Sequence, residues 1–470
     1  MNGAATRSAQ FVRNNLELLG FGGRKDALVQ AVKELFENAL DAAGAMSTEQ
    51  EWGTAAKELL RISVQANKAS VGVLDIVCGD TGSGIHAHRI KQLCCSMFET
   101  TKRKRGARAA GKYGVGLKAA VLYSQLHDAG RCLKVATTAG SGEILCVNLR
   151  INPDSEEPAI VQSVTQFAVD EAHHSFSGTE MRLSVPCPAT IVEVEEAADC
   201  LAMYFQTLGY TLPPFVSVKF SFDVGEVSTL VELSHNEEPV DRFAAELGVS
   251  DGDIKFENQA NDRFTVSCMG VLMPSQPASE PTAIEICLLR YVNHVPLLNA
   301  EDLFICGIAC GTSSPSIWKR YGLRCRSTPS HLVNQYVATP VRSGANSSDV
   351  ASRLIVAVDV CHRGSDASVK FASMRKTRVD KSYGRQVQVC MAALLRQFEE
   401  SGRLLTPAQW QLEQLSSEFA PLIARAAVGI LRTARGSSQP NACVRHVADE
   451  PTVVRQLQRV LHHQTAFSSR

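Results

Sequence analysis

Residues 34–42 read ELFENALDA, and the rest of the chain is organised around this stretch. On an α-helix, Glu34, Asn38 and Asp41 share one face, because they are four and three residues apart. The neighbouring apolar stripe is formed by Leu35, Ala39 and Ala42. Such polar groups are costly to bury unless something pairs with them, as a hydrated Mg²⁺ or a polarised water would. An ordinary amphipathic helix with a wet polar face is the alternative.

The composition is that of a globular protein, with 45% hydrophobic and 20% charged residues. Its 470 residues predict two or three domains. The net charge is zero, from 48 basic and 48 acidic residues, which argues against binding nucleic acid through bulk charge but not against a local basic patch. No apolar run predicts a membrane span or a secretory signal. Fifteen cysteines without a CxxC pair favour a reducing compartment.

The segments around residues 34–42 predict a helix followed by two strands. Asp26 is placed to cap the helix, which should end near Gly44. Residues 59–64 and 71–77 alternate like strands, with a turn expected at 67–70.

The second of these strands leads into GDTGSGI, residues 79–85. Here Asp80 stands at a strand end, followed by Gly82 and Gly84. Glycine lets the backbone approach a flat ligand, and a carboxylate can accept a hydrogen bond from an exocyclic amine such as that of adenine. A plain Asp-Gly turn is the alternative.

A basic segment and a glycine-rich segment come next. We interpret residues 86–110, which include KRKR at 102–105, as a polar loop: a lid over phosphates, or else a solvated loop or nuclear-import tract. Residues 111–118, GKYGVGLK, then open an apolar helix. Free backbone N–H groups at a helix N-terminus form an anion cradle. Lys118 would reach a phosphate or point to solvent.

The following residues alternate between strands and helices. Strands are expected at 133–138, 142–149, 159–163, 177–185 and within 211–222, and helices at 189–208, 240–247 and 384–400. Residues 236–238 and 250–258 are expected to be loops. The tail is predicted to be helical over 412–427, with the helix interrupted or kinked at Pro421. A last helix is expected at 453–461, where it would bind a partner or pack on the preceding domain.

Four elements therefore stand in order: the polar-faced helix, the Asp-x-Gly-x-Gly strand end, the basic lid with its glycine cradle, and a strand opened by Gly178-Thr179. This order resembles the Bergerat ATP-binding fold of the GHKL family, shared by gyrase, Hsp90, histidine kinases and MutL. The flanking sequence is similar to the topoisomerase VI B-subunit family. The similar segments are SAQFVRNNLELLGF (8–21), YGVGLKAAVLYSQ (113–125), RYVNHVPLL (290–298) and WKRYGL (318–323).

The resemblance implies ATP and Mg²⁺ as cofactors. It makes Glu34 the general base that orients the attacking water and Asn38 the Mg²⁺ ligand. It makes Asp80, supported by Thr179, the acceptor of the adenine amine. Asp41 would contact the nucleotide or only orient its helix. The remaining implied nucleotide-binding residues are Gly82, Gly84, Gly111, Gly114, Val115, Gly116, Leu117 and Lys118.

A lysine that reaches the γ-phosphate from the next domain is also implied. The matching segment, from residue 371 onward, is basic and divergent. We predict Lys381 for this role, with Lys370 and Lys376 as alternatives. A solvated basic strand end is the other interpretation.

The predicted fold class is α+β: an N-terminal strap (1–25), a GHKL ATPase sandwich of helices on a mixed sheet (26–225), an α/β transducer like ribosomal S5 domain 2 (226–398) and a helical tail (399–470). The expected function is that of the ATP-dependent B component of a type IIB topoisomerase, or its eukaryotic meiotic counterpart, in the nucleus. It would dimerise through the strap and act with DNA and an A-type topoisomerase component or meiotic transesterase. A non-hydrolysing scaffold of the meiotic break complex is the alternative.

Overall fold

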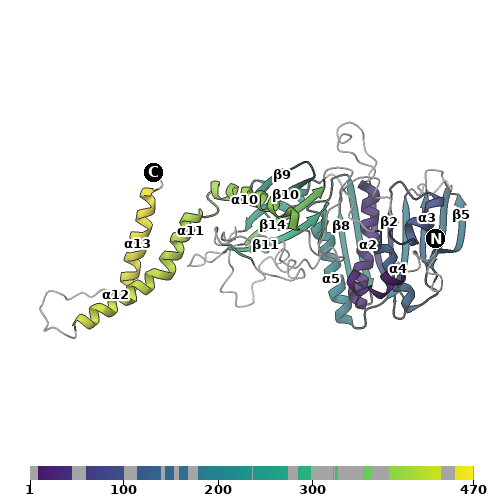
Figure 1. Ribbon diagram of the computed structural model, residues 1–470, viewed down its shortest axis with the longest axis horizontal. Coiled ribbons are helices and arrows are strands. Elements are labelled where there is room, and N and C mark those ends of the chain that lie inside the picture. The colour runs from purple at the N-terminus through teal and green to yellow at the C-terminus, as the bar shows by residue number, and fades with distance from the viewer. Residues whose placement is uncertain are drawn as a thin grey trace.

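The structure is a computed structural model that describes residues 9–44, 60–99, 114–138, 143–152, 158–167, 178–234, 237–273, 284–297, 321, 323–325, 353–362, 381–435 and 450–468. Two β-sheets with helices packed on them follow one another along the molecule, and a group of helices forms its C-terminal end (Figure 1). The α+β class is therefore confirmed.

The first sheet has eight strands in the described residues, in the order β5-β4-β3-β6-β2-β1-β7-β8. All neighbours are antiparallel except β1 and β7, so the sheet is mixed, as predicted. The strands are β1 (Leu60–Ser70), β2 (Val73–Asp80), β3 (Leu133–Thr138), β4 (Glu143–Ile151), β5 (Pro158–Phe167), β6 (Thr179–Pro186), β7 (Val216–Val224) and β8 (Val227–Leu233).

Helices α2 (Arg24–Gly44), α4 (Gly116–His127) and α5 (Ile191–Leu208) pack against this sheet. On α2 the apolar residues that sequence periodicity assigns to one stripe, such as Leu35 and Ala39, are buried in one core with the alternating inward residues of β2. Phe36 of α2 packs edge-on against Tyr204 and Phe205 of α5. The core therefore fixes α2 between the sheet and α5.

The second sheet runs β12-β11-β14-β10-β9, with β13 also paired to β11. Its strands are β9 (Ile254–Ala260), β10 (Phe264–Met273), β11 (Ile284–Val292), β12 (Val295–Pro296), β13 (Leu323–Cys325) and β14 (Arg353–His362). Helix α10 (Gly384–Glu400) packs on β9 and β10, with Leu394 and Phe398 fully buried. Along the chain, α6 (Pro239–Leu247) and the short η3 (Asp251–Asp253) come between the strands of the first sheet and those of the second.

The two sheets share a buried junction. The Tyr291 hydroxyl, on β11, donates to the carbonyl of Thr207 on α5 over 2.8 Å. The Thr211 hydroxyl, just after α5, donates to the carbonyl of His294 over 2.7 Å. The hairpin formed by β11 and β12 is thus held against the C-terminal end of α5.

The C-terminal helices are α11 (Pro407–Gln414), the π-helical η6 (Leu415–Phe419), α12 (Ala420–Arg435) and α13 (Glu450–Ser468). Thr406 opens α11 with a capping box, in which its hydroxyl accepts from Gln409 and the Gln409 side chain accepts from its backbone. The predicted interruption at Pro421 is found slightly earlier: the π-helical η6 separates α11 from α12 and ends two residues before Pro421, which is the second residue of α12.

Three local predictions are wrong, each for a physical reason. The turn expected at 67–70 falls at 71–72, where Gly72 takes a positive φ of 74°. Part of the expected 86–110 loop is α3 (Ala87–Cys95), whose Ile90, Cys94 and Cys95 are buried. Residues 254–258 are in β9, because tertiary pairing with β10 overrides their polar character.

Two predictions on helix and domain ends need adjustment. Asp26 lies inside the first turn of α2 rather than capping it. The expected boundary at 225/226 divides the β7–β8 hairpin, and the first sheet ends at Leu233. The other expected boundaries remain predictions.

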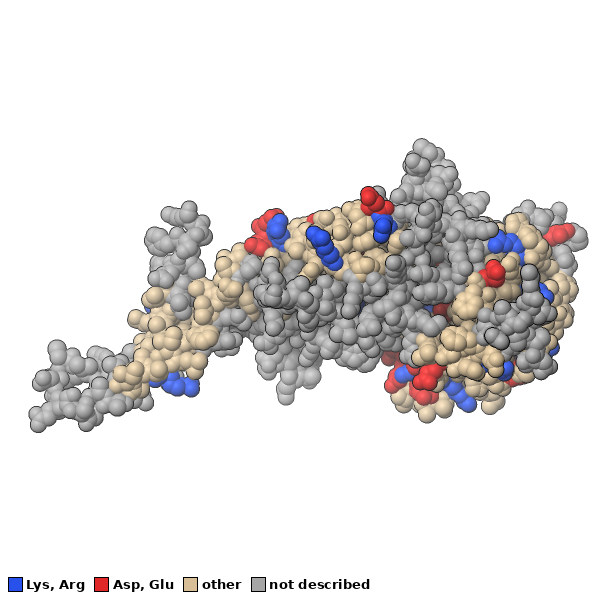
Figure 2. Space-filling model, viewed as in Figure 1, with Lys and Arg blue, Asp and Glu red and all other residues tan. Residues whose placement is uncertain are grey.

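Charged side chains of both signs are interspersed over the described part of the face in Figure 2, in keeping with the zero net charge. Among the described residues, no helix combines the length and apolarity needed to cross a bilayer.

Candidate functional site

Glu34 lies on α2 against the first turn of α4. It is buried, and its Oε1 accepts a hydrogen bond of 2.9 Å from Nε2 of Gln30, one turn earlier. Gly116, the first residue of α4, is so near that a Cβ there would stand 1.9 Å from the Glu34 Oε2. The carboxylate therefore occupies the space that any larger residue at 116 would fill. This places the general-base candidate at a helix N-terminus, where backbone N–H groups favour negative charge.

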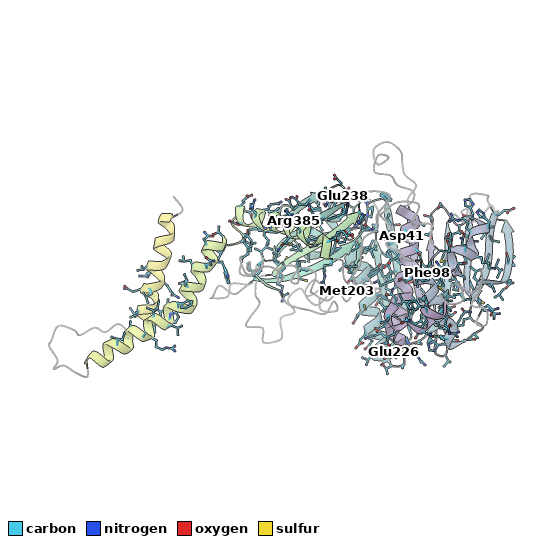
Figure 3. The ribbon with its side chains drawn as sticks, viewed as in Figure 1. Asp41, Phe98, Met203, Glu226, Glu238 and Arg385 are labelled. Carbon is cyan, nitrogen blue, oxygen red and sulfur yellow. The ribbon has the colours of Figure 1, made fainter. Side chains whose placement is uncertain are left out.

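Asn38 and Asp41 follow Glu34 along α2, and both are half-buried and engaged with other residues. Figure 3 labels Asp41 near the C-terminal end of the helix. Behind α2, burial first and then the charges of Glu37, Glu34 and Asp41 raise the pKa of the Tyr204 phenol well above its usual value. The carboxylates of α2 therefore lie close enough to α5 to contribute to the raised pKa of Tyr204.

Asp80 ends β2 as predicted, and it is 8% exposed. Its Oδ1 accepts from the backbone N–H of Gly82 over 2.8 Å, and the Thr179 N–H also bonds it. Burial raises the pKa of the Asp80 carboxyl to about 6, and these two hydrogen bonds act against the rise. Because Asp80 and Thr179 face each other across the β2–β6 ladder, the sheet itself brings the two predicted residues together.

A threonine and glycine network surrounds this strand end, and sequence reasoning missed most of it. The Thr137 hydroxyl contacts that of Thr179 at 3.1 Å and accepts from the backbone N–H of Ile85 at 2.8 Å. Gly84 has a φ of +71°, and a Cβ there would lie 1.3 Å from the Thr138 carbonyl oxygen. The Gly-x-Gly turn is therefore closely packed against β3.

Gly178, with a φ of +109°, is equally constrained. A Cβ on it would lie 1.9 Å from the Asp80 carbonyl oxygen, and its N–H donates to the Thr138 hydroxyl over 3.0 Å. The signal available in the sequence was the Thr-Thr pair that ends the strand 133–138, but its meaning depends on which strand lies beside it.

Helix α2 connects the two ends of the site. A Cβ on Gly82 would contact the Cβ of Ala42 at 3.4 Å, whereas Glu34 lies against Gly116. Residues 34 and 42 are two helical turns and a little more apart, about 12 Å along the axis. The Glu34 carboxylate therefore lies at the middle of α2, and the Asp80 turn lies near the C-terminal end of the same helix.

The residues on either side of the basic segment 100–113 meet each other. A Cβ on Gly114, which has a φ of +61°, would stand 2.5 Å from the Glu99 carbonyl oxygen. Lys118 is buried, and its Nζ donates to the same oxygen over 2.9 Å. Beside them, Phe98 has a positive φ of 60°, which is uncommon for a bulky residue (Figure 3). Lys118 therefore fixes the backbone at this junction and does not point to solvent.

The remaining predicted residues are placed as follows. Val115 and Leu117 are buried at the start of α4, so their side chains belong to the core and only their backbone faces the cradle. Lys381 is the first residue of η5 (Lys381–Tyr383), directly before α10. Gly111, Lys370 and Lys376 lie outside the described residues, as does the Lys381 side chain.

Comparison with known proteins defines the class first. Residues 27–179 match the family described as "Histidine kinase-, DNA gyrase B-, and HSP90-like ATPase". This range runs from α2 to Thr179 and contains the Glu34, Asp80 and Gly116 elements. The N-terminal part of the chain is therefore a GHKL-type ATPase domain, as the motif order predicts.

More particular relatives match the same part. The B subunit of type 2 DNA topoisomerase 6 from Saccharolobus islandicus is 30% identical over 179 residues, which are 38% of this chain and 31% of that protein. Its counterpart in Saccharolobus solfataricus is 29% identical over 184 residues, 39% of this chain and 32% of the relative. The match thus spans about a third of the length of these curated relatives.

Solved structures with a similar arrangement include the 43K ATPase domain of Thermus thermophilus gyrase B in complex with an aminocoumarin. It has 15% identity and a TM-score of 0.45, over 90% of this chain and 98% of that one. The N-terminal domain of a DNA repair protein has 12% identity and a TM-score of 0.43, over 79% and 94% of the two chains.

Proposed function

We propose that this chain binds and hydrolyses ATP as the B component of a topoisomerase VI-type (type IIB) DNA topoisomerase, or as its meiotic B-like counterpart. The observation that carries the proposal is a pair of contacts made by α2, one at its middle and one near its C-terminal end. A buried glutamate lies against the glycine that opens α4, and a buried aspartate lies in the glycine turn that contacts Ala42.

The residues present fit a nucleotide with Mg²⁺. Asp80 is a buried acceptor with glycines at both neighbouring turns, which suits a flat base bearing an exocyclic amine. The first turn of α4 begins with glycine and offers backbone N–H groups to phosphate. Mg²⁺, held by Asn38, would supply charge neutralisation for phosphoryl transfer. Gly82, Gly84, Gly114 and Gly116 would let the backbone pack closely around the nucleotide site.

Glu34 would then act as the general base. Its carboxylate is oriented by Gln30 and stands where the cradle opens, so it can hold a water and accept its proton. Asp80 and Thr179 would fix the base, and Asp41 would orient the nucleotide end of α2. These assignments would put proton transfer at the middle of α2 and base recognition at the strand end that packs near its C-terminus.

The β11–β12 hairpin supports coupling of this site to the second sheet, which we assign to a transducer. The hydrogen bonds of Tyr291 and Thr211 join that hairpin to the C-terminal end of α5 and the residues after it, and α5 packs on α2. A movement of α2 or α5 on ATP binding would therefore be felt by the second sheet. Lys381, in η5 just before α10, is our proposed γ-phosphate lysine from the transducer.

We further propose the partners. ATP binding would dimerise two copies through the strap at residues 8–21. The second sheet would pass this state to a DNA-cleaving A-type topoisomerase component or meiotic transesterase acting on DNA in the nucleus. The similarity to the B components of topoisomerase 6 supports this assignment.

The test compares wild type with Glu34→Gln and Glu34→Ala, using Glu195→Gln on the exposed face of α5 as the matched control. Wild type and all three variants should show a thermal shift and dimerise with a non-hydrolysable ATP analogue and Mg²⁺. Wild type and Glu195→Gln should turn over ATP, and the Glu34 variants should be slower by roughly 100-fold or more. Equal turnover in Glu34→Gln would remove the general-base role.

A second outcome would overturn the proposal as a whole. If the wild-type chain shows no nucleotide-dependent thermal shift, ATP is not a ligand and a scaffold of the meiotic break complex becomes the better description. Co-purification then distinguishes the partners: an A-type topoisomerase component with relaxation activity, or a meiotic transesterase without it.

A further inference from the structure

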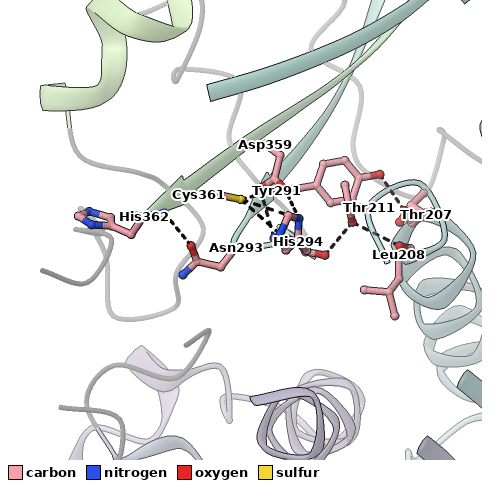
Figure 4. A network of polar contacts seen from close by, with 9 residues as sticks. All are labelled: Thr207, Leu208, Thr211, Tyr291, Asn293, His294, Asp359, Cys361 and His362. Atoms are coloured by element: carbon pink, nitrogen blue, oxygen red, sulfur yellow. Dashed lines mark hydrogen bonds and ion pairs between the residues drawn. The ribbon is translucent and has the colours of Figure 1, made fainter. Parts of the chain in front are cut away.

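A cluster of three metal-ligating side chains lies at the junction of the two sheets, outside the nucleotide site. His294 is in the two-residue turn between β11 and β12, and Asp359 and Cys361 are on the neighbouring strand β14 (Figure 4). Because Asp359 and Cys361 are two residues apart on a strand, they face the same side. His294 is separated from them by 65 positions or more in sequence, so only the fold unites the three.

The turn that carries His294 has an uncommon backbone. Asn293 and His294 have positive φ values of 50° and 68°, the geometry of a type I′ hairpin turn. Histidine at such a position is infrequent and costs energy unless the surroundings fix it. Here the His294 N–H donates to Asp359 over 3.3 Å, and the Asn293 side chain accepts from the His362 N–H over 3.1 Å. The strand β14 therefore holds in place the turn that carries His294.

The distances between the ligand atoms are close to those of a tetrahedral zinc site. Nδ1 of His294 lies 2.8 Å from Oδ2 of Asp359. Sγ of Cys361 lies 3.8 and 3.7 Å from the two ring nitrogens and 3.3 Å from the same Oδ2. Ordinary Zn–N, Zn–S and Zn–O bonds at tetrahedral angles separate N from S by about 3.6 Å, S from O by about 3.5 Å and N from O by about 3.3 Å.

Two adjustments are needed when a metal binds. The nitrogen–oxygen separation must open by about half an ångström, and the imidazole ring must turn so that one nitrogen faces the thiolate, since Sγ now lies nearly equidistant from both ring nitrogens. The set also has the right chemistry, since thiolate and imidazole ligands favour zinc over the hard cations Mg²⁺ and Ca²⁺. One side is accessible, because the His294 side chain is 45% exposed whereas Asp359 is 8% exposed. A water can therefore complete the coordination.

We propose that His294, Asp359 and Cys361 bind Zn²⁺ through one imidazole nitrogen, one carboxylate oxygen and the thiolate. The bound ion would cross-link the β11–β12 turn to β14 beside the hydrogen bond from Thr211 to the His294 carbonyl. It would therefore stiffen the contact between the second sheet and α5. Its three ligands lie outside the nucleotide site, so zinc binding can be measured without nucleotide.

The competing explanation is structural: the three side chains only hydrogen-bond to one another and hold the turn. The two explanations differ in what Cys361→Ser does. Serine keeps a hydrogen-bond donor of similar shape, so a structural network would persist, but it removes the thiolate that zinc prefers.

The test uses the untagged full chain, reduced and dialysed against a small excess of Zn²⁺, with bound zinc measured by elemental analysis. Wild type should retain zinc that Cys361→Ser and His294→Asn lack, a difference of one ion per chain. The matched controls are Cys146→Ser on β4 and His88→Asn on α3, which should bind as wild type does. Loss of an outer-shell partner weakens metal affinity by up to about 100-fold. Loss of a direct ligand should therefore weaken the affinity for Zn²⁺ by more than about 100-fold.

Two further measurements complete the test. Co²⁺ in place of Zn²⁺ should give a thiolate-to-cobalt charge-transfer absorption in wild type that Cys361→Ser lacks. Zn²⁺ should raise the melting temperature of wild type and leave that of Cys361→Ser unchanged. If Cys361→Ser retains as much zinc as wild type, or if wild type retains none, the proposal is wrong.

Discussion

The nucleotide site on the first sheet and the junction on the second sheet are built in opposite ways. The first combines short motifs, each already recognisable in the sequence, along a single helix: Glu34 and Ala42 of α2 contact Gly116 and Gly82. The junction combines single residues from the end of α5 and the loop after it, from the β11–β12 hairpin and from β14, and of these only the hairpin residues belong to a segment recognisable in the sequence. The difference shows that a site arranged along one helix can be predicted from short sequence motifs, whereas a contact between two layers cannot.

The largest expected effect tests the close packing of the Asp80 turn. Gly84→Ala would bring a Cβ to 1.3 Å from the Thr138 carbonyl oxygen, a backbone atom that cannot move aside. We expect a loss of more than about 4 kcal/mol in the free energy of unfolding, measured by urea denaturation. Gly72→Ala is the control, because Gly72 has a similar φ of +74° and no neighbour within 4 Å. It should cost only about 1 kcal/mol. Equal losses in the two variants would contradict the packing.

Asp80→Asn should change the pH dependence of stability. Burial raises the pKa of Asp80 from 3.8 to about 6 in the folded chain, so the folded state binds this proton more tightly than the unfolded state does. The resulting stabilisation is present below about pH 4 and is lost as the pH rises through about 6, a difference of roughly 3 kcal/mol.

The asparagine variant should therefore lack that part of the slope between pH 4 and pH 6, and it should bind ATP analogue more weakly. Denaturation curves across this pH range measure the first, and isothermal calorimetry measures the second. Asp223→Asn, on an exposed position of β7, should leave both unchanged. An unaltered slope in Asp80→Asn would show that the buried carboxyl does not titrate as described.

Gly116→Ala tests the contact between Glu34 of α2 and the start of α4. The new methyl group would meet the flexible end of the Glu34 side chain, so the fold should lose less than about 1 kcal/mol. The displaced carboxylate should lower ATP turnover by roughly 100-fold, as measured in a phosphate-release assay. Gly23→Ala, which has no neighbour within 4 Å, is the control and should keep wild-type turnover. Wild-type ATP turnover in Gly116→Ala would show that the position of the Glu34 carboxylate is not required for hydrolysis.

The smallest effect concerns the junction. Thr211→Val removes the hydroxyl that donates to the His294 carbonyl and should cost about 1 kcal/mol of unfolding free energy. Thr229→Val, on the edge strand β8, is the control and should stay within about 0.5 kcal/mol of wild type. A Thr211→Val variant as stable as the control would mean that this bond does not hold the sheets together.

The sequence by itself determined most of the first domain. Helix periodicity identified α2 and α5, alternation identified the strands of the first sheet except β8, and the glycine positions identified the Asp80 turn and the start of α4. These features depend on neighbours within a few residues, so local patterns encode them. Asp80 and Thr179 were predicted as partners through a resemblance, and the β2–β6 ladder brings them together.

Only the tertiary structure decided the rest. Thr137 and Thr138 join the site because β3 lies beside β6, and β9 is a strand because β10 pairs with it. Lys118 is fixed by the carbonyl of Glu99 rather than by solvent, and the cluster of His294, Asp359 and Cys361 exists only where a turn meets a distant strand. The physical reason is the same in each case: a side chain's role depends on what packs against it, and sequence patterns record an element's own periodicity but not its neighbours across the sheet.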